Sequence, residues 1–177
     1  MKFKGIIFDL DGVICSTDRH HYNAWKKISD ENGLYFDEAM NNKLRGVSRA
    51  ESLEIILREN KRTFSEEKKQ QLLEKKNAFY IEELNFLNAS AMKNDVPATL
   101  EKIKKGAKIA IGSSSKNTQF ILNKLGIKNL FNAVCDGTMI SKSKPDPEVF
   151  LLAAKSLKLK PCECLVVEDS IAGIDAA

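Results

Sequence analysis

The sequence lacks any long hydrophobic run. No apolar stretch approaches the roughly 18 residues that a membrane-spanning helix needs, and the basic first residues are followed only by Ile6-Ile7-Phe8 before Asp9 interrupts. That stretch is too short for the apolar part of a secretory signal. We therefore expect a cytoplasmic protein with no membrane partner.

Cysteine is scarce, and neither sign of charge dominates. The four cysteines, at positions 15, 135, 162 and 164, form no C-x-x-C pair, and Cys162-x-Cys164 has no histidine nearby. Buried or inert reduced thiols are expected, since a zinc site needs a richer ligand pattern. Lysine and arginine number 28 against 24 acidic residues, a net charge of +4. Because the lysines alternate with glutamates on predicted helices, they indicate solvated faces, and we expect no nucleic-acid partner. We also expect a monomer.

Short apolar runs typical of buried parallel strands are present at residues 3–10, 107–112, 133–135 and 164–167. Helical periodicity predicts helices between the later runs and after the last one. These helices cover residues 96–105, 117–125, 147–157 and Ile171 onward. Strands that alternate with helices predict an α/β fold with a parallel sheet and right-handed crossovers.

A helical segment interrupts this α/β pattern after the first strand. Residues 18–31 carry an apolar stripe at helical spacing, and residues 36–86 predict three or four helices, with starts at Ser48 and Ser65. We expect a core of residues 1–14 and 90–177 and an inserted helical domain of residues 15–89. The last helix reaches Ala177 without a glycine cap or a closing strand, so we expect the C-terminal part of the core to be missing.

Polar residues follow the predicted strands, at the edge where open α/β sheets bind ligands. They are Asp9, Asp11, Ser113, Ser114, Lys144, Glu168 and Asp169. Two acids two positions apart in extended backbone point the same way and repel each other unless a hard cation such as Mg²⁺ lies between them. A lysine and a serine could hold a phosphoryl group while one carboxylate attacks it and the other moves a proton. The pattern predicts phosphoryl transfer.

Four motifs together carry a family resemblance: Phe8-Asp9-Leu10-Asp11-Gly12-Val13, Ser113, Lys144-Pro145 and Glu168-Asp169-Ser170-x-x-Gly173. They resemble the motifs of the haloacid dehalogenase superfamily. The resemblance implies a Rossmann-like core, Mg²⁺, an aspartyl nucleophile and a helical cap inserted after the first motif.

Further matches lie mostly in the insert: His21-x-x-Ala24-Trp25, Leu44-Arg45-Gly46-Val47-Ser48-Arg49, Lys76-Asn77 and, outside it, Ser113-Ser114-Ser115-Lys116-Asn117. They resemble the β-phosphoglucomutase family of that superfamily. The resemblance implies an isomerase of carbohydrate metabolism. Such an enzyme interconverts β-glucose 1-phosphate and glucose 6-phosphate through an aspartyl-phosphate and a bisphosphate intermediate.

The resemblance also implies a role for each matching residue. Asp9 would be the nucleophile and Asp11 the general acid and base. The implied metal ligands are Asp9, Asp11, Glu168 and Asp169, and the implied phosphate ligands are Ser113, Ser114 and Lys144. The implied substrate contacts are Gly46, Val47, Ser48, Arg49, Lys76, Ser115, Lys116 and Asn117, with Arg49 on the distal phosphate. Thr17, His21 and Trp25 would act at the hinge or gate, with Trp25 packed between cap and core.

Two other interpretations stay open. A sugar-phosphate or phosphoglycolate-type phosphatase could use the same core, with water in place of the accepting sugar hydroxyl. The abrupt end at Ala177 also leaves open a non-catalytic fragment.

Overall fold

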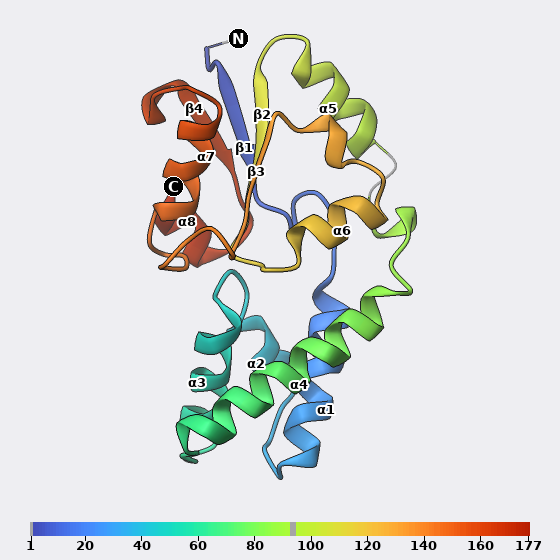
Figure 1. The fold of residues 1–177 in the computed structure, drawn as a ribbon, viewed down its shortest axis with the longest axis vertical. Helices are drawn as coiled ribbons and strands as arrows, with labels where there is room; N and C mark the ends of the chain where they lie inside the picture. The colour runs from blue at the N-terminus through green and yellow to red at the C-terminus, as the bar shows by residue number, and fades with distance from the viewer. Residues whose placement is uncertain (1, 93–94) are drawn as a thin grey trace.

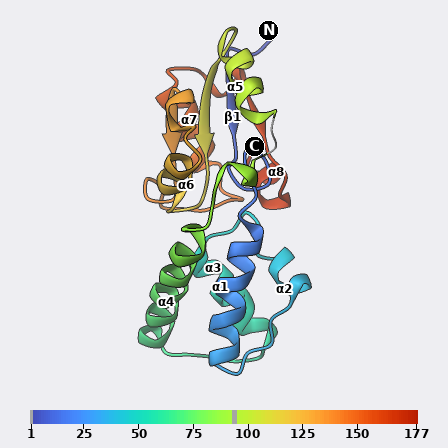
Figure 2. The same cartoon turned by 90° about the vertical axis from the view of Figure 1, so that its right-hand side faces the viewer.

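Two lobes make up the molecule (Figure 1). The computed structural model describes residues 2–92 and 95–177; Met1 and residues 93–94, which fall inside the predicted core segments, lie outside the described residues. One lobe contains the sheet and both chain ends, and we call it the sheet lobe. The other contains helices α1 to α4, and we call it the helical lobe (Figures 1 and 2).

The sheet has four parallel strands in the order β3-β2-β1-β4. They are β1 (Gly5–Phe8), β2 (Lys108–Gly112), β3 (Ala133–Cys135) and β4 (Cys164–Val167). Phe8 lies opposite Ile111 of β2 and Val167 of β4, so the three strands end at one level. The predicted α/β parallel sheet is confirmed, and its register brings the residues after each strand to one edge.

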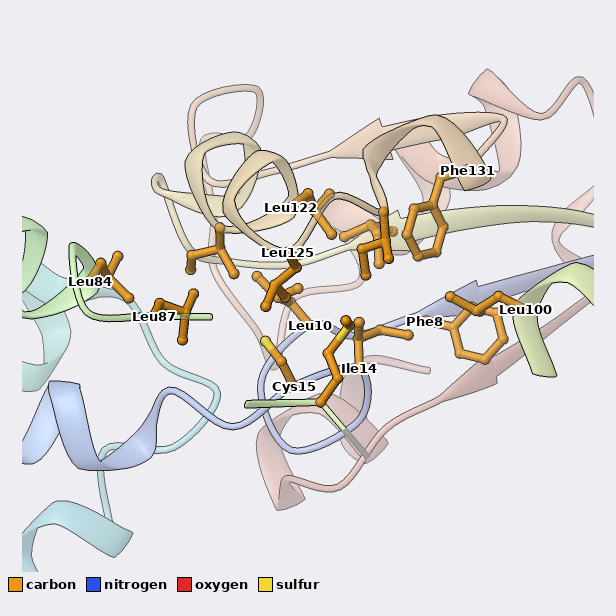
Figure 3. Packing of buried hydrophobic residues seen from close by; sticks show 14 of the residues in the cluster. Phe8, Leu10, Ile14, Cys15, Leu84, Leu87, Leu100, Leu122, Leu125 and Phe131 are labelled. Atoms are coloured by element: carbon orange, nitrogen blue, oxygen red, sulfur yellow. The ribbon is translucent and has the colours of Figure 1, made fainter. Parts of the chain in front are cut away.

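Helices cover both faces of the sheet. They are α5 (Val96–Lys104), α6 (Thr118–Lys124), α7 (Glu148–Ser156) and α8 (Ile171–Ala176), with short 3₁₀ turns at Ala89–Ala91, Lys128–Leu130 and Pro161–Glu163. Because side chains alternate along a strand, Phe8 of β1 packs in a cluster with Leu100 of α5 and Leu122 of α6, whereas Ile7 packs in a cluster with Phe150 of α7. The first cluster is seen in Figure 3.

The helical lobe has its own apolar core. Its helices are α1 (Asp18–Glu31), α2 (Glu38–Asn42), α3 (Arg49–Glu59) and α4 (Glu66–Leu84). The predicted starts are confirmed, because the hydroxyls of Ser48 and Ser65 accept hydrogen bonds from the backbone N–H groups of Glu51 and Lys68. Trp25 is buried within this core, so the prediction that it packs between the insert and the sheet is wrong.

Two chain segments join the lobes and lie side by side. The Ser16 N–H donates to the Ala91 carbonyl oxygen over 3.0 Å. The sheet-lobe core reaches this junction, because Leu84 and Leu87 belong to the same buried cluster as Leu10 (Figure 3). Leu10 is fully buried, as expected of a core residue.

All four cysteines are free. Cys15 and Cys135 are buried, but Cys162 is exposed, because it lies in the surface 3₁₀ turn Pro161–Glu163, so burial does not apply to this thiol. Over the described part of the chain, we find no helix with the length and apolar character to cross a membrane.

Candidate active site

A cavity of about 650 Å³ is lined by residues of both lobes. Of the residues predicted for the site, all except Thr17 and Glu168 line it, and those two contact lining residues. The sheet contributes the loops after all four strands. The helical lobe contributes the start of α3 and one face of α4. The folded chain therefore brings the motifs together although they are spread from Asp9 to Ser170.

A buried lysine links two carboxylates at the end of the sheet. The Lys144 Nζ lies 2.6 Å from Asp9 Oδ1 and 2.5 Å from Glu168 Oε1, and the lysine is 1% exposed. Glu168 Oε2 accepts hydrogen bonds from the N–H and hydroxyl of Ser170. Burial raises the pKa of Asp9 to about 7, although the charge of Lys144 acts against the rise. A cation bound at this carboxylate would also oppose it.

Asp11 faces a different partner. The chain leaves the strand at Phe8 and bends, so the argument from extended backbone, which placed the Asp9 and Asp11 side chains together, is wrong. The Asp11 carboxylate accepts hydrogen bonds from the Thr17 N–H, over 3.0 Å, and from the Thr17 hydroxyl. Burial raises the pKa of Asp11, and the two hydrogen bonds from Thr17 act to lower it.

The acidic residues fit a hard cation. Asp9, Glu168 and Asp169 each offer a carboxylate oxygen, and these oxygens lie within 4.8 Å of one another. Both oxygens of Glu168 already accept hydrogen bonds, which leaves Asp9 and Asp169 as the better donors. The Asp11 carboxylate is not part of this cluster. All-oxygen donors suit Mg²⁺ or Ca²⁺ rather than a softer metal.

Gly12 makes room for Asp169 at this cluster. Its φ is +83°, and a Cβ there would lie 2.0 Å from Asp169 Oδ2. Only glycine combines this backbone conformation with this close approach.

Serine residues line the cavity beside Asp9. Ser113 follows β2 and is buried, and its Oγ accepts from the Ser115 N–H over 3.2 Å, which leaves its hydroxyl hydrogen free to donate. The Ser114 Oγ is buried, and among the described residues it has no hydrogen-bond partner. A buried orphan hydroxyl in a cavity wall fits a phosphate oxygen as its missing partner.

Two cations of the helical lobe face the cavity without a carboxylate. Arg49 begins α3, and one of its terminal nitrogens lies 3.4 Å from the Leu73 carbonyl oxygen. Lys76 is 2% exposed, and its Nζ lies 3.0 Å from His21 Nδ1. Within residues 2–92 and 95–177, neither side chain has an acidic group within 4 Å. Burial lowers the pKa of both groups, so a bound anion would be well placed to balance their charge.

The remaining predicted residues also belong to the cavity wall. Gly46, Val47, Ser48, Ser115, Lys116 and Asn117 all line it. The Asn117 amide nitrogen donates to Asn77 Oδ1 over 3.0 Å and so joins the two lobes.

Sequence reasoning missed Asn77 and Tyr80 as candidate site residues. Tyr80 lines the cavity, and its hydroxyl lies 2.9 Å from the Thr17 hydroxyl. A signal was present, because Tyr80 follows Lys76 by four residues and therefore lies on the same face of a helix.

Known proteins resemble this chain over nearly its whole length. A family model described as haloacid dehalogenase-like hydrolase matches residues 3–177. The β-phosphoglucomutase of Bacillus subtilis is 42% identical over 178 residues, which cover 98% of this chain and 78% of that protein. A phosphorylated-carbohydrate phosphatase of Thermotoga maritima is 30% identical over 98% of this chain and 80% of its own length.

A solved structure agrees in fold. The crystal structure of β-phosphoglucomutase from Clostridium difficile superimposes with a TM-score of 0.92 at 39% identity, and the match covers 98% of this chain and 79% of that one. The Rossmann-like architecture inferred from the motifs is thereby confirmed. With the family model matched from residue 3 to residue 177, the chain belongs to the haloacid dehalogenase-like hydrolase family.

Proposed function

We propose that the chain is a Mg²⁺-dependent mutase that interconverts β-glucose 1-phosphate and glucose 6-phosphate. One observation carries the proposal. The cavity has the ion pair of Asp9 and Lys144 on its sheet wall and, on its helical wall, the cations Arg49 and Lys76, which have no carboxylate partner in the part of the chain that the structure describes. A mutase must hold two phosphates at once, and an arginine away from the metal suits the second phosphate. The β-phosphoglucomutase relatives support this choice of substrate.

The proposed chemistry uses an aspartyl-phosphate on Asp9. The 6-hydroxyl of β-glucose 1-phosphate attacks this phosphorus, Asp11 takes the hydroxyl proton, and the bond from phosphorus to Asp9 breaks. The product is the 1,6-bisphosphate, which turns over in the cavity. Asp9 then attacks the 1-phosphate, the bond to the sugar oxygen breaks, and Asp11 returns the proton to that oxygen. Glucose 6-phosphate leaves, and the aspartyl-phosphate is restored.

The remaining residues would bind and orient. Lys144, Ser113 and Ser114 would hold the transferring phosphoryl group, and Arg49 with Lys116 and Asn117 would hold the distal phosphate. Lys76 and residues 46–48 would face the sugar. The carboxylates of Asp9 and Asp169 and the Asp11 backbone carbonyl would hold Mg²⁺, which when bound offsets negative charge on the transferring group.

In this proposal, the division into two lobes allows the cavity to close and exclude water. Residues 1–14 and 90–177 would form the catalytic core and residues 15–89 the cap. Closure of the cap over the cavity would keep water from the aspartyl-phosphate. We further propose that the enzyme acts in the cytoplasm, because its four free thiols fit a reducing compartment. We propose that it acts there as a monomer.

A phosphatase is the second candidate. The Thermotoga maritima relative is named as a phosphatase of phosphorylated carbohydrates, and water could accept the phosphoryl group from the same aspartyl-phosphate. The two candidates differ in the acceptor, and therefore in the product.

A coupled assay separates them. The protein is given β-glucose 1-phosphate, Mg²⁺ and a trace of the 1,6-bisphosphate, and glucose 6-phosphate and free phosphate are followed together, with Asp9→Asn as the blank. We expect glucose 6-phosphate without matching phosphate release. Phosphate release in its place would favour the phosphatase, and no turnover from folded protein would favour the non-catalytic alternative.

Arg49→Gln tests the second phosphate site, with Arg58→Gln as its matched control. Arg58 lies on the same helix but is exposed and does not line the cavity. We expect Arg49→Gln to raise KM at least tenfold, since a charge-assisted contact is worth about 1.5–3 kcal/mol. A KM equal to that of Arg58→Gln would contradict the role of Arg49.

A further inference from the structure

A chain of hydroxyl groups runs from α4 to the carboxylate of Asp11. The Tyr80 hydroxyl lies 2.9 Å from the Thr17 hydroxyl, which in turn hydrogen-bonds Asp11 Oδ1. Thr17 is fully buried and Tyr80 is 1% exposed, so water has little access to compete for these groups. In such a buried chain, each hydroxyl can hydrogen-bond only to its neighbours in the chain. The hydrogen bonds therefore fix the orientation of each group.

The ring of Tyr80 also contacts two other residues that line the cavity, His21 and Lys76. Its centroid lies 4.1 Å from that of His21 and 4.4 Å from the Lys76 Nζ. The Lys76 Nζ also lies 3.0 Å from His21 Nδ1. Tyr80 therefore contacts both the group that would face the sugar and, through Thr17, the group that would move the proton.

The direction of the hydrogen bonds follows from chemistry. Burial and the nearby charge of Asp11 raise the pKa of Tyr80 well above its ordinary value, so the tyrosine keeps its hydrogen at neutral pH. An ionised Asp11 only accepts hydrogen bonds. The Thr17 hydroxyl then donates to Asp11 and accepts from Tyr80.

We propose that Tyr80 is a positioning residue for the acid–base step: through Thr17, its hydroxyl fixes the carboxylate of Asp11. This rests on the proposed function, in which Asp11 moves the proton. Tyr80 does not exchange a proton with substrate itself. Without its hydroxyl, Thr17 has one hydrogen-bond partner fewer and holds Asp11 in a wider range of orientations. Fewer encounters would then have the proton-transfer geometry, while substrate binding would be little changed.

The test is a double-mutant cycle of Tyr80→Phe and Thr17→Val, with Tyr35→Phe as the matched control. Tyr35 also donates to a carboxylate, that of Asp37, but it is 66% exposed and does not line the cavity. We expect Tyr80→Phe to lower kcat about tenfold, with KM within about threefold of wild type. Adding Tyr80→Phe to Thr17→Val should lower kcat no further, because the hydroxyl chain is already broken. Tyr35→Phe should match wild type.

Three results would overturn the inference: a wild-type kcat in Tyr80→Phe, a raised KM at unchanged kcat, or additive effects of the two changes. A lowered urea midpoint without a change in kcat would show a purely structural role and would also overturn it. If the wild type turns over β-glucose 1-phosphate and Tyr80→Phe does so equally well, the proposed function stands and this inference fails.

If the wild type does not turn over the sugar phosphate, the proposed function fails, and kcat of the four proteins of the double-mutant cycle is measured with p-nitrophenyl phosphate instead. With either substrate, an NMR measurement adds a test that needs no turnover. The ¹³Cγ resonance of Asp11 at one fixed pH should differ between wild type and Tyr80→Phe and agree between wild type and Tyr35→Phe. An unchanged resonance in Tyr80→Phe would overturn the inference whatever the substrate.

Discussion

Lys76 places an ammonium group in the interior of the helical lobe. It is 2% exposed, and its Nζ lies against His21 Nδ1 and over the rings of Trp25 and Tyr80. Burial, and then the charge of Arg49, holds the pKa of Lys76 well below its ordinary value. A buried cation without a carboxylate partner lowers the stability of the free protein. Binding of an anion or a sugar would offset this loss.

Replacing Lys76 with methionine should therefore stabilise the free protein. Methionine keeps the length of the side chain and removes the charge, so we expect Lys76→Met to raise the free energy of unfolding by about 2 kcal/mol at neutral pH. Sugar-phosphate turnover should fall sharply in the same variant. Urea unfolding measures the first effect, and Lys75→Met, an exposed lysine paired with Glu31, should change stability by about 0.5 kcal/mol or less.

The gain from Lys76→Met should shrink as pH rises. Between the lowered pKa in the folded protein and the ordinary pKa of the unfolded chain, the unfolded state binds more protons at Lys76, so wild-type stability increases with pH there. The difference between variant and wild type should fall by up to about 1.4 kcal/mol per pH unit in that window. Urea midpoints at several pH values measure it, and a difference independent of pH would contradict the lowered pKa.

Asp169 is the residue on which metal dependence is best tested. We expect EDTA to abolish turnover and added Mg²⁺ to restore it, because Asp9 and Asp169 would then face each other without a cation. Asp169→Asn should raise the Mg²⁺ concentration for half-maximal activity at least tenfold. Asp175→Asn, an exposed acid on α8 outside the cluster, serves as control. Full activity in EDTA would argue against a metal-dependent site.

At the level of elements, the start of α3 depends on a glycine before it. Gly46 has a φ of +79°, and a Cβ there would lie 2.4 Å from the Oγ of Ser170, which belongs to the sheet lobe. The following turn ends at Ser48, which caps α3 and so sets the position of Arg49. The backbone of this loop therefore decides where the helical lobe meets the loop after β4.

Gly46→Ala should lower stability and turnover more than Gly33→Ala. Gly33 has a φ of +63° but nothing within 4 Å of an added Cβ, so its alanine variant measures the conformational cost alone, about 1–2 kcal/mol. Gly46→Ala adds the contact with Ser170 and should displace the loop, with a rise in KM for the sugar phosphate. Equal urea midpoints and equal KM values in the two variants would mean that the close approach has no consequence.

The helices and strands were predicted well from the sequence. The strands at 133–135 and 164–167 and the helix at 18–31 match their predicted bounds, because apolar runs and helical stripes reflect burial within one segment. Residues at strand ends, such as Asp9 and Ser113, were also predictable, because parallel strands place their carboxyl ends at one edge. Contacts between distant segments were not: Tyr80 lies 63 positions from Thr17, and no local pattern records that hydrogen bond.

Two errors have the same origin. Asp11 was expected to point with Asp9, but one bend after Phe8 directs it to Thr17 instead. Trp25 was expected between the lobes, but it lies within the helical-lobe core. Both depend on how a helix or loop is turned against the rest of the molecule, which packing decides after the local structure has formed.

For the whole molecule, the cavity is lined by residues of both lobes, so a change in their relative position would alter access to it. The side chains of Asn77 and Asn117 join the lobes through a 3.0 Å hydrogen bond, and Gly46 approaches Ser170 elsewhere around the cavity. In the proposed reaction, water competes with the sugar hydroxyl whenever the lobes are apart. The ratio of free phosphate to glucose 6-phosphate therefore reports how completely they close.

Asn77→Ala should raise that ratio. Loss of one hydrogen bond, worth about 1 kcal/mol, should lower the ratio of closed to open forms about fivefold, and hydrolysis should rise by up to the same factor. Asn42→Ala, an exposed asparagine on α2 that does not line the cavity, is the matched control and should keep the wild-type ratio. The opposite result, a lower KM with an unchanged ratio, would mean that Asn77 holds Asn117 away from the substrate instead of holding the lobes together. Product ratios measured at saturating β-glucose 1-phosphate distinguish the two, because occupancy of the site is then equal in all variants.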